Sequence, residues 1–391
     1  MAEQRKRNIG RRAGVSFLLF SAVFLMASGF YREEIQLTES DRGFATANMG
    51  LSNELPFVDR IPEDQPVRVL SLDAGGIRGI IELQVLVHLE EMTGKSISEL
   101  FDVIVGTSTG AVISVGLLMP DDEGNPRFTA RELLEIYENQ VRSLSEVPWY
   151  HSVMTLDGLL GPQYSVEPGR AFVSRNYGMV SMGDLLGDAV VALLDLENLE
   201  PRFISSRQIS RPGGRTMRDN FLACDTVMAC CAVPMLVPPM VIRNVEGERM
   251  FVGLDGGAFA FAPAPFAVSE VMHRYPGRQI VMLSLGTGMV PGGWEAEDAR
   301  SWGSIDWVSA SMPIMLRSQV RYAEEIMQKM ASDKGTVMSH YLRMNPSIPA
   351  ELEVVSVGSS DVVDRLDAIG EELVSTHQED ITELMSRLHR N

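Results

Sequence analysis

The sequence predicts an α/β protein in which helices cover both faces of a mostly parallel sheet. Two observations lead to this prediction. Short apolar runs rich in β-branched residues recur along the chain, as in strands that are buried on both faces. Helical patterns lie between most of these runs, and this alternation is typical of a parallel sheet. The composition agrees, because 45% of the 391 residues are apolar and can fill a large core.

The expected elements follow one another from residue 67. They are a strand at 67–73, a helix at 79–94, a strand at 101–107, an apolar and therefore buried helix at 110–119, and further strands at 189–198, 251–254 and 278–288. Thr129 and Glu132 have the spacing of a capping box at the start of another helix. The sequence contains no internal repeat, so residues 66–391 are expected to form one domain.

The chain is acidic, with a formal net charge of −18. A protein with this charge is a poor partner for the phosphates of a nucleic acid, so we expect no nucleic-acid binding. The charge is unevenly distributed, since five basic residues lie among the first twelve and residues 13–30 carry no charge. Residues 31–65 are polar and without a clear period, which predicts a linker.

Residues 1–30 have the layout of either a secretory signal peptide or a membrane anchor. A basic start followed by an apolar segment and small residues at Ala27 and Gly29 suits a cleaved signal. Eighteen uncharged residues are also just enough to span a bilayer. Both interpretations place the remaining chain outside the cytoplasm, with membrane association through this segment in the second. If Met49 is the true start, the protein is cytoplasmic.

The cysteines and histidines predict neither a disulfide framework nor a metal site. Cys224, Cys230 and Cys231 are odd in number and lie in one apolar run, as small buried residues of a helix do. The histidines show no metal-ligand spacing. We therefore expect a protein without metal or cofactor.

Three glycine-containing motifs follow predicted strands and carry candidate chemistry. LDAGGIRG covers residues 72–79, GTSTG covers 106–110 with Ser108 at its centre, and LDGG covers 254–257. A G-x-S-x-G serine typically lies on a strand-to-helix turn as a nucleophile. Because the carboxyl ends of parallel strands share one edge of a sheet, we expect the three turns to converge.

The nucleophile requires a base, and Asp255 is the candidate. A serine hydroxyl is unreactive unless a neighbouring group accepts its proton. A carboxylate with the usual pKa of about 3.9 is a weak base, but burial raises that pKa. The glycine-rich turn at residues 72–79 offers backbone N–H groups that would stabilise an oxyanion.

Several blocks of the sequence resemble the patatin-like phospholipase family, in the order in which that family carries them. They are VLSLDAGGIRGI, FDVIVGTSTGA, GLLGPQYS, DLEN, FVGLDGG, IVMLSLGTG and YLRMNP, spread between residue 67 and about residue 372. The resemblance implies a three-layer α/β/α fold and hydrolysis of fatty-acyl esters of lipids or phospholipids by a Ser–Asp dyad and an acyl-enzyme.

The resemblance also assigns roles to individual residues. Ser108 becomes the nucleophile, with Gly106 and Gly110 in its turn, and Asp255 the general base, with Gly256 and Gly257 in its loop. The oxyanion hole is assigned to the backbone N–H groups of Gly75 and Gly76, with Arg78 favouring negative charge nearby.

The sequence departs from the family pattern at two places. Ala74 stands where the family has the first of three glycines, and this alanine is strained if its φ is positive. Phe261 and Ala262 precede Pro263 where the family has two asparagines, which would help to order the loop that carries Asp255.

Two other functions stay open at this point. One is an α/β-hydrolase with a Ser–Asp–His triad, in which His273, His377 or His389 occupies the right place in the chain order. The other is an inactive lipid-binding protein. Residues 301–330, rich in tryptophan and methionine, are expected either to pack on the sheet or to form a lid or membrane-contacting face, and packing is favoured.

Overall fold

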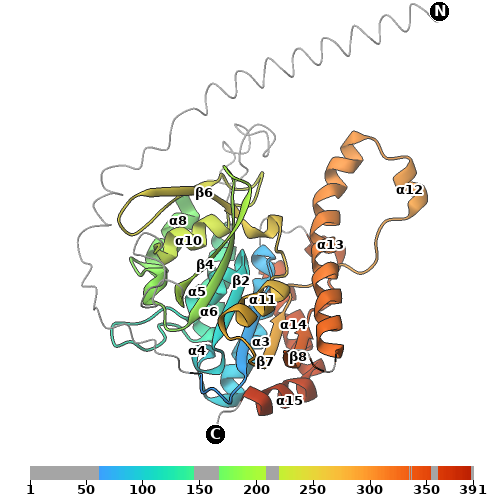
Figure 1. Ribbon diagram of the computed structural model, residues 1–391. Coiled ribbons are helices and arrows are strands. Elements are labelled where there is room, and N and C mark those ends of the chain that lie inside the picture. Colours follow the sequence, from blue (N-terminus) through green and yellow to red (C-terminus); the bar gives the residue numbers. More distant parts are fainter. Residues whose placement is uncertain are drawn as a thin grey trace, which may run out of the picture.

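One mixed sheet organises the protein (Figure 1). The structure is a computed structural model that describes residues 61–144, 167–207, 220–333, 335, 337–353 and 360–388. The predicted signal or anchor, the GLLGPQYS block and His389 lie outside these residues. Among the described residues, no helix is long and apolar enough to cross a membrane.

The sheet has eight strands in the order β5-β6-β3-β2-β1-β7-β8, and β4 pairs with β3. The strands are β1 Val67–Leu72, β2 Val103–Thr107, β3 Asp188–Asp195, β4 Glu200–Ser205, β5 Met240–Arg243, β6 Arg249–Asp255, β7 Ile280–Leu285 and β8 Met338–Met344. The five strands β3, β2, β1, β7 and β8 are parallel to their neighbours in that row. The mostly parallel sheet predicted from the sequence is thus confirmed.

Helices cover both faces of the sheet, and the alternation of side chains along each strand shows which face each residue serves. Leu70 and Leu72 of β1 belong to the core cluster under one helical layer, whereas Val67 and Val69 belong to the cluster under α11 and α13. The first layer consists of α3 Gly79–Thr93, α4 Ile97–Leu100, α5 Thr109–Leu117, α6 Ala130–Leu144, α8 Glu167–Tyr177, α10 Ala223–Cys230, α14 Ser360–Thr376 and α15 Gln378–Leu388. The second contains α11 Ala264–Arg274 and α13 Ser304–Ser332. This is the predicted three-layer arrangement.

One strand runs opposite to the prediction. The strand that carries the LDGG motif, β6, is antiparallel to β3, so its carboxyl end does not lie in a row with those of the parallel strands. The two motifs meet for another reason. Ala192 of β3 pairs with Thr107 at the end of β2, and the next residue, Leu193, pairs with Asp255 at the end of β6. Since β4 occupies the other edge of β3, β2 and β6 approach each other end to end along one edge.

Helix α13 combines the two alternatives considered for residues 301–330. Its second half packs on the body, where Val320, Ala323 and Met327 are buried. Its first half stands free of the body together with α12 Ala296–Arg300 (Figure 1), and Ile305 is 82% exposed. The favoured prediction, a helix packed on the sheet, therefore holds only for the second half.

The packed part of the chain starts earlier than the predicted linker boundary. Ile61 is buried in the core cluster that lies under α11 and α13. Arg278 donates hydrogen bonds to the carbonyl oxygens of Pro62 and Gln65 and so holds this segment against the body. The domain therefore includes residues 61–65. The sequence did not indicate this, because the one buried isoleucine stands among polar residues.

A buried ion pair joins β8 to the turn after β1, and its loss should destabilise the fold. Nη2 of Arg343 lies 2.6 Å from Oδ2 of Asp73, and both side chains are largely buried. We expect Arg343→Met to lower the free energy of unfolding by about 3–5 kcal/mol, because Asp73 would stay buried without its cation. Urea denaturation measures this change. Arg365→Met, which breaks an exposed pair with Glu351, should cost less than about 1 kcal/mol, and an equal loss in both variants would contradict the argument.

Candidate active site

Ser108 lies at a sharp turn between β2 and α5. Its backbone has φ 54° and ψ −119°, a conformation that costs a non-glycine residue about 1–3 kcal/mol. The two glycines of the motif make the turn possible. A Cβ on Gly106 would lie 2.3 Å from the carbonyl oxygen of Gly110, and one on Gly110 would lie 2.4 Å from that of Leu72. The side chain is held at the start of α5, where the helix dipole favours developing negative charge.

Asp255 ends β6 and is almost entirely buried. The N–H of Gly257 donates a 2.6 Å hydrogen bond to Oδ1, and Oδ2 has no partner of standard geometry among the described residues. Burial raises the pKa of this carboxyl to about 6, although hydrogen bonding from the Gly257 N–H and the Ser108 hydroxyl lowers it. The structure thus places the two predicted residues side by side and leaves one carboxyl oxygen free to accept a proton.

In the glycine-rich turn, the carbonyl oxygens of residues 74–76 accept hydrogen bonds, whereas two of the N–H groups are free. The carbonyl oxygen of Ala74 accepts from Thr287 Oγ1 at 2.7 Å, and that of Gly76 accepts from Tyr137 Oη at 2.6 Å. The Gly75 carbonyl oxygen accepts from Arg78. Among the described residues, no acceptor takes the N–H of Gly75 or Gly76. Such free, oriented donors are what an oxyanion hole requires.

The guanidinium of Arg78 is engaged with backbone carbonyl groups and does not point into the site. Its guanidinium donates to the carbonyl oxygens of Gly75 and Gly288, at 3.3 and 2.9 Å. The side chain is buried, and burial lowers its pKa to about 10 while nearby carboxylates counteract this effect. Arg78 therefore ties the glycine-rich turn to the loop after β7. The groups that could donate hydrogen bonds to an oxyanion are the backbone N–H groups of the turn.

Neither departure from the family pattern disrupts the site. Ala74 is not among the residues with positive φ, so the alanine is unstrained. Its N–H donates to the carbonyl oxygen of Phe261 at 2.8 Å, which joins the two departing segments directly. Ala74, Phe261 and Ala262 form one apolar cluster with Val320 and Ala323 of α13. The two departures thus pack against each other.

Gln319 of α13 is a supporting residue that the sequence analysis did not single out. Its Nε2 donates to the carbonyl oxygen of Gly257 at 3.1 Å, and its Oε1 accepts from the N–H of Phe261 at 3.0 Å. Thr107 adds a third tie, because its Oγ1 donates to the Ala260 carbonyl oxygen at 2.7 Å. These bonds order the loop after Asp255, the role considered above for the missing asparagines.

Neither of the two described triad candidates, His273 and His377, donates to the Asp255 carboxyl. His273 is exposed in the last turn of α11, and Nδ1 of His377 lies 2.9 Å from the carbonyl oxygen of Leu373. The hydrogen bonds to the Asp255 carboxyl come from Gly257 and Ser108. Within the described ranges, no group of three or more His, Cys, Asp or Glu residues could hold a metal ion.

The raised pKa of Asp255 has a consequence for stability. A folded-state pKa above the unfolded value means that ionisation opposes folding, so this group reduces stability as the pH rises from about 4 to 6. Asp255→Asn removes this effect. We expect the gain in unfolding free energy from the substitution to be about 1 kcal/mol larger at about pH 8 than at about pH 5, as measured by urea denaturation.

Asp195→Asn provides a control with the opposite sign. Asp195 is buried, which by itself raises the pKa of a carboxyl, but hydrogen bonds from Asn198 and Arg202 lower it overall. This substitution should therefore cost stability at both pH values. A gain for Asp255→Asn that is the same at both pH values would show that Asp255 does not titrate in this window.

Comparison with known proteins gives the family. The patatin-like phospholipase model matches residues 70–268, which contain all three motifs. Patatin-like protein 2 of Arabidopsis thaliana is 28% identical over 62% of this chain and 65% of its own length, so the chain spans slightly less than two thirds of that relative. Patatin-like protein 1 of the same plant is 25% identical over 79% of this chain and 81% of its own. Probable inactive patatin-like protein 9 of that plant is 26% identical over 64% and 68%. This chain belongs to the patatin-like phospholipase family.

Proposed function

We propose that the protein is a lipid acyl hydrolase that cleaves fatty-acyl esters with Ser108 as nucleophile and Asp255 as general base. One observation carries this proposal. The Asp255 carboxyl lies beside the strained Ser108, and its Oδ2 has no partner of standard geometry among the described residues, while burial raises its pKa to about 6. A base is most effective when its pKa is near the working pH.

In the first half of the reaction, Ser108 Oγ attacks the ester carbonyl carbon and its proton passes to Oδ2 of Asp255. The carbonyl oxygen gains negative charge and is stabilised by the free N–H groups of Gly75 and Gly76. When the tetrahedral intermediate collapses, the C–O bond of the ester breaks. The leaving alcohol takes the proton from Asp255, and the acyl group stays on Ser108.

In the second half, water replaces the alcohol. Asp255 accepts a proton from the water as its oxygen attacks the acyl carbon, and the same N–H groups stabilise the second tetrahedral intermediate. Ser108 then leaves with the proton, and a fatty acid is released. The Gly257 N–H holds Oδ1 throughout, so that Oδ2 alone handles the proton.

The same contacts favour a dyad over a triad. A triad histidine bridges the serine and the aspartate. Here the carboxyl interacts with Ser108 itself, while His377 bonds a backbone carbonyl and His273 lies exposed at the far end of α11.

We also propose that residues 1–30 place this domain outside the cytoplasm, as a cleaved signal or as an anchor.

A serine-reactive fluorophosphonate tests the dyad. We expect an adduct on Ser108, identified by peptide mass spectrometry, and none in Ser108→Ala. The labelling rate should fall about tenfold per pH unit below about pH 6, because Asp255 must be ionised to accept the proton. Asp255→Asn should lose labelling at every pH, whereas replacement of each histidine in turn should not. Folded protein without an adduct on Ser108 would favour a lipid-binding role, and loss of labelling on one histidine change would favour a triad.

Gln319 offers a second test, since it holds the loop that positions Asp255. Gln319→Met keeps the length of the side chain but removes both hydrogen bonds. We expect kcat for a soluble ester to fall by about 10- to 100-fold with little change in KM, because a small displacement of a catalytic group has effects of this size. Gln328→Met, the same change at an exposed position of α13, should leave kcat unchanged. Equal kinetics in both variants would show that the loop is held without Gln319.

A further inference from the structure

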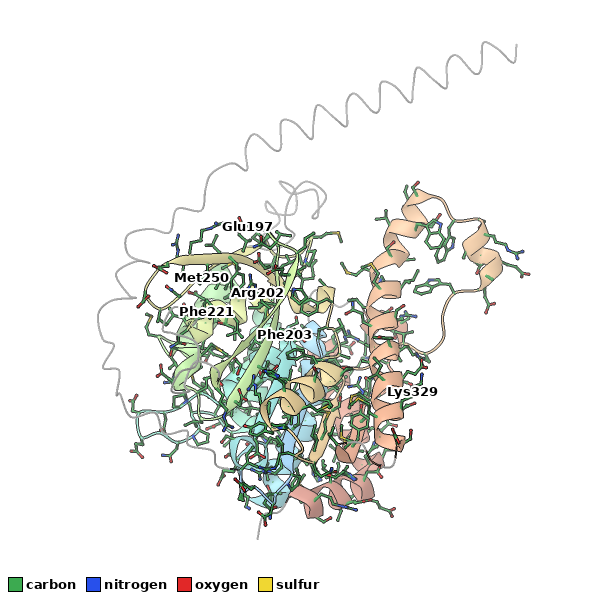
Figure 2. The ribbon with its side chains drawn as sticks, in the orientation of Figure 1. Glu197, Arg202, Phe203, Phe221, Met250 and Lys329 are labelled. Atoms are coloured by element: carbon green, nitrogen blue, oxygen red, sulfur yellow. The ribbon has the colours of Figure 1, made fainter. Side chains whose placement is uncertain are left out.

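The first half of α13 and the segment before it form a projection that the body of the protein does not cover. We call residues 294–315 the tip. Every residue from Gly303 to Ser309 is exposed, and Val308 is 74% exposed. Figure 2 shows the side chains of α12 and of the upper part of α13 standing clear of the sheet and its helices. The tip is thus attached to the domain chiefly through the lower half of α13.

The exposed side chains of the tip are more apolar than those of an ordinary helix that faces water. Ile305, Val308, Met312 and Met315 follow one another at intervals of three and four residues and are all exposed. Spacing of this kind places them along one side of the helix. Residues 304–316 contain a single charged residue, Asp306, whereas the exposed side of a surface helix is ordinarily charged.

Three of the four tryptophans of the chain lie in the tip and touch one another. The rings of Trp294 and Trp302 pack edge to face at 6.1 Å, and those of Trp302 and Trp307 at 4.9 Å. The guanidinium of Arg317 lies over the Trp294 ring at 4.9 Å, and Arg317 also pairs with Glu353 of the body. Tryptophan has an apolar ring and a polar N–H, and it is enriched where a membrane meets water.

The tip continues directly into the active site. One turn beyond Met315, Gln319 holds the loop of Asp255, and Leu316 and Val320 pack with Ala74 of the glycine-rich turn. Other exposed apolar residues lie at the same end of the sheet as Ser108. Leu199 is 71% exposed in the β3–β4 turn, and β3 runs parallel to β2, whose last residue, Thr107, precedes Ser108. A surface that covered the tip would therefore face the end of the sheet where Ser108 lies.

The charges around the tip select among the surfaces that could cover it. Four carboxylates border the apolar residues, and the tip contains one cation, Arg300. The carboxylates are Glu295, Glu297, Asp298 and Asp306. A symmetric contact with a second copy would bring these carboxylates together, and an anionic lipid surface would repel them. The choline or ethanolamine groups of zwitterionic lipids are positively charged and complement them. We propose that the tip docks on a zwitterionic lipid surface and delivers its lipids to Ser108, an inference that rests on the proposed function.

Quenching of tryptophan fluorescence by brominated lipid tests the docking directly. The protein is the full chain carrying Ser108→Ala, which prevents turnover, and Trp149→Phe, which leaves only the three tryptophans of the tip. We expect vesicles of brominated phosphatidylcholine to quench their emission, and vesicles rich in brominated phosphatidylglycerol to do so less. Ile305→Ser with Val308→Ser should weaken vesicle binding by about tenfold or more, since two exposed aliphatic side chains are lost from the contact.

A matched control replaces exposed methionines elsewhere. Met92 and Met272 are exposed, and the helices that carry them, α3 and α11, begin at the active-site turns and end far from them. Met92→Ser with Met272→Ser should leave quenching unchanged. Quenching that is equal in the two double variants would overturn the proposal. Vesicle binding without quenching would also overturn it, because the contact would then belong to residues 13–30. The same holds if the protein does not bind vesicles but self-associates, and the tip variant abolishes that self-association.

Failure of the docking and failure of the proposed function give different results. With Ser108 intact, the variant with Ile305→Ser and Val308→Ser should hydrolyse a soluble short-chain ester at the normal rate. It should lose only its activity on phosphatidylcholine vesicles. Gln319→Met should lose activity on both. Quenching without any fluorophosphonate adduct on Ser108 would leave the docking standing and remove the hydrolase, whereas an adduct without quenching would do the reverse.

Discussion

The site depends on the pairing of β3 with two strands along one edge. Thr107 at the end of β2 and Asp255 at the end of β6 oppose consecutive residues of β3, Ala192 and Leu193. The pairing fixes the backbone of Asp255 and of Thr107, which precedes Ser108. The loop after Asp255 then orients its carboxyl through the Gly257 N–H. The proposed Ser–Asp dyad would depend on this rigidity, because it has no histidine between the serine and the carboxylate.

Burial at the junction of β2 and β6 raises the pKa of Asp255 and at the same time lowers the stability of the fold. The junction is enclosed by packed helices, so the carboxyl of Asp255 is desolvated and its pKa is raised to about 6. Ser108 holds a backbone conformation that a non-glycine residue adopts only under constraint. Both features reduce stability locally, and the packed core on the two faces of the sheet offsets them. Strain and a perturbed carboxyl at one place are what a catalytic site leads one to expect.

Local patterns in the sequence predicted what local contacts determine. Gly106 and Gly110 mark the turn because only glycine fits against the neighbouring backbone, and buried strands are recognisable from their apolar runs. The direction of β6 was not predictable in this way, since a parallel and an antiparallel strand can carry the same residues. Gln319 lies 62 residues from Gly257 along the chain, and a glutamine in a helix gives no sign of such a contact. An Asp-Gly pair alone does not indicate a base. The role of Asp255 followed from its combination with the serine motif and the glycine-rich turn, and the family resemblance assigns the same role.

Helix α13 shows why burial cannot be inferred from apolar spacing alone. Its two halves carry similar periodic apolar residues, yet Val320 and Met327 are buried while Ile305 and Val308 are exposed. The hydrophobic effect favours removing such residues from water, and it is indifferent to whether protein or lipid replaces the water. In the second half, protein does so, and Gln319 is fixed there against the loop of Asp255. For the first half, the same physical effect favours the lipid surface that we propose as its partner. A single helix would then connect the proposed lipid contact to the loop of Asp255.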